Sequence, residues 1–577
     1  MPDSNLLYYG DNLDILRRYI PDESVDLIYL DPPFNSERNY NVIFKNEAGR
    51  NTDAQLVAFE DAWHWGPNAE KVYAYLTNSA RHEGRVPDPV TSIVAALRKG
   101  IGDNPMMAYI VEMSVRLVEL HRVLKLTGSI FLHCDPTAGH YLRLVLDAIF
   151  DARNFQNEIV WKRSSAHSDT TQGAVHLGRT HDLIHFYSKG ASPTRNVVMI
   201  PFSKEYVESH YRHEEPVTGR RYRLGDLTAA KPGGDTLYEW TSPAGKSVRP
   251  YKGRYWAYTK EKMAEFERQG RLVYTKSGMP EYKRYLDDNP GQPLQDIWDD
   301  IPPINSQAKE RLGYPTQKPE ALLERIVALA SNPGDIVLDP FCGCGTALVA
   351  AQKLERRWIG IDITYLAIAV MKARLKDSFG LEAVKVLGQP TEVEGARQFA
   401  QSPSGRYQFQ FWVLTLVDAQ PVGGKEKKGA DRGIDGVITF TDKHGVLQTV
   451  LVSVKSGHVN SAMVRDLKGT IEREKAVIGL FLTLEEPTKE MQLEADTAGL
   501  FHSEVWKRDY PKVQILSIRE LLELGKKPQL PPFVMPTYPQ AQKVEAKADQ
   551  AGLFDVERPL KMVAEPPPPK YSAENES

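Results

Sequence analysis

Residues 25–34 read VDLIYLDPPF, an apolar run that stops at a carboxylate followed by two prolines. The first six residues have the length and the β-rich composition of a buried strand, and the prolines prevent that strand from continuing. The tetrapeptide Asp31-Pro32-Pro33-Phe34 is therefore predicted at the C-terminal edge of a strand, where ligands bind in open α/β sheets. By itself, the tetrapeptide is as consistent with a strand-ending turn as with a functional site.

Strands and helices are predicted to alternate along the first part of the chain. Apolar residues recur at helical spacing from Ile110 through Met113 and Leu117 to Leu120, for example, which indicates an amphipathic helix. This alternation favours a parallel sheet with helices on both faces. The predicted elements are strands at 6–9, 129–133, 158–161 and 181–187 and helices at 13–20, 107–124 and 141–150, with residues 45–105 left as an insertion containing some helix.

The composition is that of a globular protein, with 41% hydrophobic and 25% charged residues. A length of 577 residues predicts about three domains. Apolar runs stay well short of the ~18 residues of a membrane span, and the start of the chain lacks a signal-peptide pattern, so we expect a cytoplasmic protein with no membrane partner. Three cysteines are too few for a disulfide framework or a four-cysteine zinc site.

Aromatic and cationic residues are interleaved between about 191 and 305, as in RRYR at 220–223 and RYW at 254–256. Arginine and lysine neutralise phosphates, and aromatic planes stack on bases. The alternative is a loop-rich domain with solvated charges and tyrosines in its core. As an insertion beside the active-site edge of an α/β enzyme, the segment is better explained as a region that contacts a macromolecular substrate.

A second motif, IVLDPFCGCGT at residues 336–346, runs from a predicted strand through a Gly-x-Gly turn into a helix. Such a turn lets the backbone approach a ligand closely. About twenty residues later, WIGID at 358–362 ends another predicted strand with a carboxylate that suits the hydroxyls of an adenosine ribose. Cys342 and Cys344 lack further metal ligands nearby, so we expect small packing residues and no metal site.

Residues 5–370 resemble a β-class DNA amino-methyltransferase, with the catalytic motif before, and the cofactor loop after, an inserted recognition region. The resemblance is carried by Asp31-Pro32-Pro33-Phe34, by residues 339–346 and by YPTQKP at 314–319. It implies an α/β, Rossmann-like sheet that binds S-adenosyl-L-methionine, and double-stranded DNA as partner. A dinucleotide dehydrogenase is disfavoured because the tetrapeptide has no role there. The implied cofactor-binding residues are Asp11, Lys318, Asp339, Phe341, Gly343, Gly345, Thr346 and Asp362.

Two of these residues have simpler alternative roles. Asp11 matches the family's contact to the cofactor adenine, but it also suits the N-cap of a helix. Lys318 is placed to pair with the methionine carboxylate, although an exposed lysine near a helix start is the alternative.

The resemblance also implies a mechanism for the tetrapeptide. The target base must leave the duplex. Phe34 is then expected to stack on it, while the Asp31 carboxylate and the Pro32 carbonyl accept its amino hydrogens and Pro33 stiffens the turn. Relatives with Asp at the first position mostly act on the N6 amine of adenine, and Ser is commoner for N4 of cytosine. Adenine is therefore predicted, with cytosine N4 as the alternative.

Residues 395–530 form a separate predicted unit that resembles the Mrr-like branch of PD-(D/E)XK nucleases. In that family an Asp, an acid or Gln, and a Lys converge on a metal and the scissile phosphate. Asp435 and Lys455 match, but Ser453 stands where the second ligand is needed, which makes cleavage doubtful. A nuclease-like module that contacts DNA is predicted, with a bifunctional methyltransferase-nuclease as the alternative.

The remaining predictions concern the tail and the partners. Residues from 531 are rich in Pro, Ala, Lys and Glu and are expected to be disordered. Within them, residues Gln550 to Phe554 (QAGLF) resemble a sliding-clamp-binding peptide, with a simple apolar patch as the alternative. A homodimer and a restriction-modification system are open, as is a DNA-binding protein on a degenerate scaffold. The predicted domains are 1–190 and 306–385 (methyltransferase core), 191–305 (target recognition), 395–530 (nuclease-like) and 531–577 (tail).

Overall fold

The computed structural model divides the chain into two compact units, one formed by residues up to Asn196 together with Gln295–Val544 and the other containing Val197–Leu294. Phe34 and the peptide from Gln550 to Phe554 lie outside the described residues. The described residues are 5–33, 39–45, 51–60, 63–164, 175, 177–231, 235–288, 291–305, 307–314, 316–401, 405–422, 433–442, 446–532 and 540–544.

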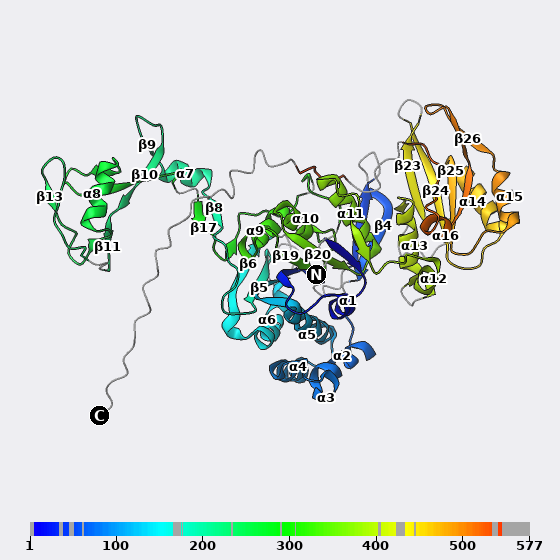
Figure 1. Cartoon of the computed structure of the whole chain (residues 1–577), viewed down its shortest axis with the longest axis horizontal. Helices are drawn as coiled ribbons and strands as arrows, with labels where there is room; N and C mark the ends of the chain where they lie inside the picture. Colours follow the sequence, from blue (N-terminus) through cyan, green and yellow to red (C-terminus); the bar gives the residue numbers. More distant parts are fainter. Residues whose placement is uncertain are drawn as a thin grey trace. The chain divides into compact units, whose positions relative to one another are not determined.

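The centre of the first unit is a sheet of nine strands among the described residues (Figure 1). All of its neighbouring strands pair in parallel except β7, which is antiparallel to both of its neighbours. In spatial order the strands are β18 (Ile297–Trp298), β6 (Phe155–Lys162), β7 (His181–Ser188), β5 (Leu124–Cys134), β2 (Val25–Leu30), β19 (Ile336–Asp339), β20 (Arg357–Asp362), β1 (Leu6–Tyr9) and β21 (Lys385–Leu387).

The antiparallel β7 departs from the all-parallel sheet that the sequence predicted. Strands β5 and β6 have the same direction, and β7 returns between them. An antiparallel neighbour does not need a crossover helix, so the alternation of strands and helices ends at this point of the chain. The predicted strand at 25–30 is confirmed, and all six residues of β2 are buried.

Helices cover both faces of this sheet (Figure 1). On one face, α1 (Asn12–Tyr19), α5 (Pro105–Val123) and α6 (Pro136–Phe150) share an apolar core with alternate residues of the strands, such as Ile28 and Leu338. Helices α9 (Glu320–Ala330), α10 (Thr346–Lys353) and α11 (Tyr365–Phe379) contact the strands as well. Gly360 of β20 lies against Leu348 of α10, where an added Cβ would come within 2.6 Å of the leucine.

The helix predicted to reach residue 124 ends one residue earlier, because Leu124 already pairs with Val25 of β2. The insertion predicted at 45–105 contains part of a hairpin and three helices. These elements are β3 (Asn39–Lys45), β4 (Asn51–Glu60), α2 (Pro67–Thr77), α3 (Ser79–His82) and α4 (Asp88–Ile101), and the short 3-10 helix η1 (Ala152–Asn154) follows α6. Within the described residues, no helix is long and apolar enough to cross a membrane.

Among its described residues, the second unit has short strands and two helices around a small core of its own. Several aromatic residues of the predicted recognition region belong to its buried interior, among them Trp240, Trp256 and Tyr285. Its elements are β8 (Met199–Pro201), α7 (Lys204–His210), β9 (His213–Glu214), β10 (Arg221–Asp226), β11 (Thr228–Ala229), β12 (Trp240–Thr241), β13 (Ser247–Val248), β14 (Tyr255–Trp256), α8 (Lys260–Arg268), β15 (Leu272–Tyr274), β16 (Pro280–Tyr285) and β17 (Gly291–Pro293).

The C-terminal part of the first unit has a sheet of its own, in the order β22-β23-β24-β25-β28 among the described residues. The elements are α12 (Val393–Gln401), α13 (Gly405–Leu416), β22 (Gln420–Pro421), β23 (Gly436–Thr441), β24 (Leu447–Lys455), α14 (Ser461–Arg473), β25 (Ile478–Thr483), α15 (Lys489–Asp496), β26 (Leu500–Ser503), β27 (Arg508–Pro511), β28 (Val513–Ser517) and α16 (Ile518–Leu522).

Candidate active site

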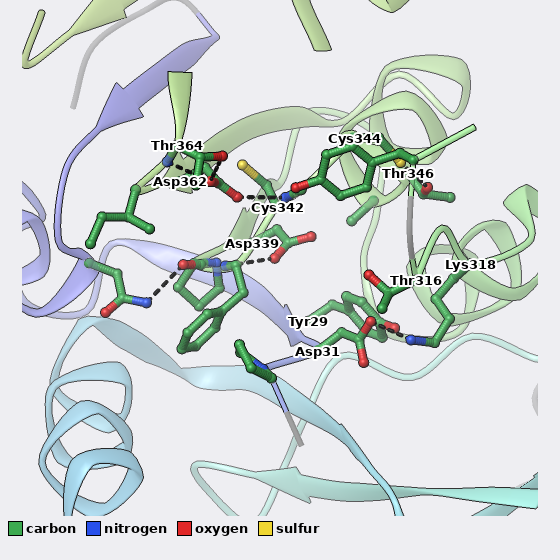
Figure 2. Close-up of a pocket in the computed structure, with 18 of the residues that line it drawn as sticks. Tyr29, Asp31, Thr316, Lys318, Asp339, Cys342, Cys344, Thr346, Asp362 and Thr364 are labelled. Atoms are coloured by element: carbon green, nitrogen blue, oxygen red, sulfur yellow. Dashed lines mark hydrogen bonds and ion pairs between the residues drawn. The ribbon is translucent and has the colours of Figure 1, made fainter. Parts of the chain in front are cut away.

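A cavity of about 340 Å³ opens at the C-terminal ends of β1, β2, β19 and β20. Figure 2 shows Asp31 and Lys318 at one end, Asp362 and Thr364 at the other, and Asp339 between them. Residues predicted for catalysis and residues predicted for cofactor binding therefore line the same cavity. Pro32 and Gly345 are absent from its wall. The residues of the predicted site that line it are Asp11, Asp31, Pro33, Lys318, Asp339, Phe341, Gly343, Thr346 and Asp362.

Asp31 follows β2 directly and is held by an ion pair with Lys318. The two side chains are 16% and 12% exposed, and the lysine Nζ contacts Oδ2 of the aspartate. The other carboxylate oxygen, Oδ1, is buried and has no hydrogen-bond partner among the described residues. A buried acceptor without a donor is costly, so a ligand that brings an N–H to this oxygen would remove that cost.

The Gly-x-Gly turn follows β19, as the sequence predicted. Asp339 ends the strand, and its carboxylate accepts a hydrogen bond of 3.0 Å from the amide of Phe341. Burial raises the pKa of Asp339 well above its usual range. Gly343 and Gly345 have φ angles of +48° and +77°, a left-handed region that favours glycine.

Asp362 ends β20 and faces this turn. Its Oδ2 accepts a 2.9 Å hydrogen bond from the amide of Gly343, and its Oδ1 accepts two bonds of 2.9 Å from the amide and hydroxyl of Thr364. Burial raises the pKa of Asp362 to about 6, although these hydrogen bonds act in the opposite direction. The carboxylate therefore changes charge close to neutral pH.

This pKa predicts a pH dependence for any ligand that donates hydroxyl groups to Asp362. Below about pH 6 the side chain is protonated and one of its oxygens becomes a donor, so affinity is expected to fall as pH drops from 7.5 to 5.

The stability of the ligand-free protein should change in the opposite sense. The folded-state pKa exceeds the ordinary 3.8, so the contribution of this group to stability is lost as pH rises to about 6.

Calorimetric titration of S-adenosyl-L-methionine across this pH range checks the prediction. The Asp362→Asn variant is the control, because it should bind more weakly with no inflection near pH 6. An inflection that persists in Asp362→Asn would contradict the assignment to this carboxylate.

Asp11 is the N-cap of α1, one of the two roles predicted for it. Its Oδ1 accepts hydrogen bonds from the amides of Leu13 (2.9 Å) and Asp14 (3.3 Å). Its Oδ2 pairs with Arg116 of α5 at 2.9 Å, and the side chain still lines the cavity. Asp11 thus acts as the N-cap of α1, and this role does not prevent its side chain from also contacting a cofactor.

Sequence reasoning missed several residues of the wall, including Tyr29, Trp63 and Arg116. Tyr29 precedes Asp31 by two positions, so the period-2 alternation of a strand was a usable signal for it. Its hydroxyl lies 3.0 Å from Nδ1 of buried His133, whose Nε2 lies 3.2 Å from Asp182. These buried contacts hold Tyr29 in place at the end of the cavity that contains Asp31.

The predicted nuclease-like residues are arranged differently from a metal site. Both oxygens of Asp435 accept 2.6 Å hydrogen bonds, from Nε2 of Gln410 and from the amide of Val454. Ser453 is buried in β24, and Lys455 ends that strand. Among the described residues, no group of three or more His, Cys, Asp or Glu side chains is placed to hold a metal ion.

Comparison with known proteins gives two family matches. Residues 25–371 match an N6/N4 family described as DNA methylase, and residues 418–523 match one described as NACHT-associated inactive Restriction Endonuclease 1.

Individual relatives were also found. The Type II methyltransferase M.EcaI of Enterobacter cloacae is 33% identical over 269 residues, which is 46% of this chain and 57% of the relative. The Type III restriction-modification enzyme StyLTI Mod subunit of Salmonella typhimurium is 28% identical over 365 residues, 61% of this chain and 50% of the relative. The chain thus spans about half the length of these curated relatives. A DNA modification methylase structure from Thermus thermophilus, complexed with S-adenosyl-L-methionine, has a TM-score of 0.31 and 16% identity, covering 67% of this chain and 99% of that one.

The first family match takes in more than half of the chain. It includes both the tetrapeptide at the end of β2 and the glycine turn after β19, the two segments that build the cavity. The chain therefore belongs to the N6/N4 DNA methylase family.

Proposed function

We propose that this chain is a site-specific DNA methyltransferase that transfers a methyl group from S-adenosyl-L-methionine to the exocyclic N6 amine of a flipped adenine in duplex DNA. The observation that carries the proposal is the buried, unpartnered Oδ1 of Asp31. It lies in the same cavity as the Gly343 turn and Asp362. An oxygen that can accept a hydrogen from an amine and residues suited to bind a nucleoside thus line the same cavity.

The residues at the Asp362 end fit the proposed cofactor. The acid is held by the backbone amides of Gly343 and Thr364, and it is suited to accept hydrogen bonds from ribose hydroxyls. Gly343 lies against Tyr314, where an added Cβ would come within 3.2 Å of the ring, so a larger residue there would require the tyrosine to shift. When bound, S-adenosyl-L-methionine would supply a methyl group on a positively charged sulfur.

The residues at the Asp31 end fit the amine. Asp31 Oδ1 accepts one amino hydrogen, which helps to turn the nitrogen lone pair toward the methyl donor. The Pro32 carbonyl is assigned the second hydrogen by the family resemblance alone, because Pro32 is absent from the cavity wall. Lys318 fixes the orientation of the Asp31 carboxylate through Oδ2. Phe34 stacking on the base remains part of the proposal. Base flipping is required because a stacked, paired amine does not reach this cavity.

Adenine is proposed over cytosine because Asp stands at the first position of the tetrapeptide, and cytosine N4 is the second candidate. The test is to express the chain in a methylation-free bacterial host and to digest the genomic DNA to nucleosides. Mass spectrometry should then detect N6-methyldeoxyadenosine at one sequence context. N4-methyldeoxycytidine alone would replace adenine by cytosine, and the absence of any modified base would contradict the enzyme and favour a DNA-binding scaffold.

The C-terminal domain is proposed to contact DNA without cleaving it. We expect the full chain with Mg²⁺ to leave supercoiled plasmid intact, because Ser453 supplies no charge where a second metal ligand is needed and the described residues contain no group of three His, Cys, Asp or Glu side chains placed to hold a metal ion. Agarose gels of plasmid incubated with wild type and Asp435→Ala check this. Nicking by the wild type that disappears in Asp435→Ala would establish a bifunctional nuclease instead.

Three further partners remain proposals. A role in a restriction-modification system follows from the names of the curated relatives. A homodimer and sliding-clamp binding through residues 550–554 are testable by light scattering and by titration of the clamp with the corresponding peptide. A peptide that does not bind the clamp would end the second of these.

A further inference from the structure

We infer that the C-terminal nuclease-like domain positions the cofactor site, with helix α13 holding the loop that follows Asp362. This inference rests on the proposed function, in which the cavity binds S-adenosyl-L-methionine. It gives a role to a domain in which the described residues contain no group of three or more side chains placed to hold a metal ion. Three sets of contacts support it, one apolar, one aromatic and one polar.

The apolar contact is a single core shared by the two parts of the chain. On the methyltransferase side it contains Tyr314 and Cys344, which line the cavity, and Tyr365 of α11. On the other side it contains Trp412 of α13 and, beyond it, Val452 of β24. The back wall of the cavity is therefore continuous with the interior of the C-terminal domain.

The aromatic contact lies where the loop after Asp362 begins α11. Tyr9 at the end of β1 stacks on Tyr365, with ring centroids 3.8 Å apart. Phe399 of α12 meets both rings edge-on, at 5.9 and 5.6 Å, and it also meets Trp412 edge-on at 6.3 Å. Edge-to-face packing of this kind favours one geometry over others, so α12 and α13 fix the start of α11.

The polar contact is made by Gln408, whose Oε1 accepts a hydrogen bond of 3.2 Å from the backbone amide of Tyr365. That amide belongs to the first turn of α11, where N–H groups have no partner within the helix. The preceding residue, Thr364, donates both its amide and its hydroxyl to Asp362. Gln408 is thus a positioning residue that acts on the carboxylate through Thr364.

Helix α13 is itself anchored by the residue that would ligate metal in an active nuclease. Gln410 donates its Nε2 to Asp435 at 2.6 Å, and it lies two positions after Gln408, about 200° around the helix. One side of α13 therefore contacts the cofactor loop, and the other contacts the former metal-ligand position. In this arrangement, Asp435 serves to hold α13 in place.

The test uses the full chain and measures the dissociation constant of S-adenosyl-L-methionine by calorimetry, together with the melting temperature. Gln408→Ala should weaken binding by roughly fivefold, the equivalent of one hydrogen bond, with only a small fall in melting temperature from the Tyr365 amide that loses its partner. Gln408→Glu keeps the accepting oxygen and should bind nearly as well as wild type. Gln398→Ala on α12, whose amide donates to exposed Glu394 at 3.5 Å, is the matched control.

Asp435→Ala provides the second, independent variant, and it should also weaken cofactor binding although it lies outside the cavity. In steady-state assays both variants should raise KM for the cofactor and leave kcat unchanged. If folded Gln408→Ala and Asp435→Ala bind S-adenosyl-L-methionine with wild-type affinity, this inference is wrong while the proposed function stands. Failure of the wild type to bind S-adenosyl-L-methionine would overturn the proposed function as well.

Discussion

Replacement of Asp31 by alanine is expected to lower the rate of methyl transfer by roughly 10²–10³-fold, the usual effect of removing one preorganised group that stabilises developing charge. Asp31 Oδ1 is a buried acceptor without a partner among the described residues, so we expect it to form its hydrogen bond with the substrate amine. Cofactor affinity should stay close to that of the wild type, because Asp362, the proposed ribose-binding carboxylate, is at the other end of the cavity. Single-turnover assays and calorimetry measure the two quantities separately.

Asp22→Ala is the matched control for this variant. Asp22 is also an aspartate paired with a cation, Arg122, but it is largely exposed and lies away from the cavity wall. Its removal should leave the rate unchanged. Loss of cofactor binding in Asp31→Ala, or a rate close to wild type, would contradict the role assigned to Asp31.

The second large effect is expected from Gly345→Ala, which should lower the melting temperature and weaken cofactor binding by more than roughly tenfold. Gly345 has a φ of +77°, and a Cβ there would lie 2.5 Å from Cγ of Met371 in α11. The clash is with the inner part of the methionine side chain, so α11 or the glycine turn must move. A shift of the turn displaces Gly343, and a shift of α11 displaces its N-cap Thr364; both residues donate to Asp362.

Gly334→Ala separates the clash from the backbone strain. Gly334 has a similar φ of +86°, but nothing lies within 4 Å of an added Cβ. Both variants bear the cost of a left-handed alanine, about 1–2 kcal/mol. Only Gly345→Ala should lose cofactor affinity, and equal affinities in the two variants would show that the turn tolerates the methyl group.

The parts of the fold that the sequence predicted are those with local signals. β2 and β19 are short apolar runs that stop at Pro or Gly, and both are fully buried strands in the structure. Because β2 and β19 are parallel neighbours that end at the same edge, Asp31 and Gly343 line the same cavity. The roles of the individual site residues stay predictions until they are tested.

The parts that sequence reasoning missed depend on contacts between distant residues. Lys318 pairs with Asp31 across 287 positions, and Tyr29 reaches His133 across 104. No periodicity in the chain encodes such pairs, because each depends on how whole elements pack. The same reason applies to Gln408 and Tyr365, and to the antiparallel direction of β7.

In the predicted recognition region, the interleaved aromatic and cationic residues were interpreted from composition as a surface that contacts DNA bases. In the structure, Trp256 and Tyr211 are fully buried, and Arg220 stacks on Tyr285 while pairing with Asp287. Much of the aromatic-cationic pattern therefore stabilises the unit itself. Composition does not distinguish an arginine that is paired within the protein from one that is available to phosphate.

We propose that one cavity holds both the exocyclic amine of a DNA base and the methyl donor. The most direct measurement incubates purified protein with S-adenosyl-L-methionine labelled in its methyl group and with DNA from a methylation-free host. The DNA is then digested and its nucleosides are separated. We expect label in N6-methyldeoxyadenosine for the wild type, and an initial rate of labelling roughly 10²–10³-fold lower for Asp31→Ala. Label that appears only in added RNA or protein, or in no product despite bound cofactor, would contradict it.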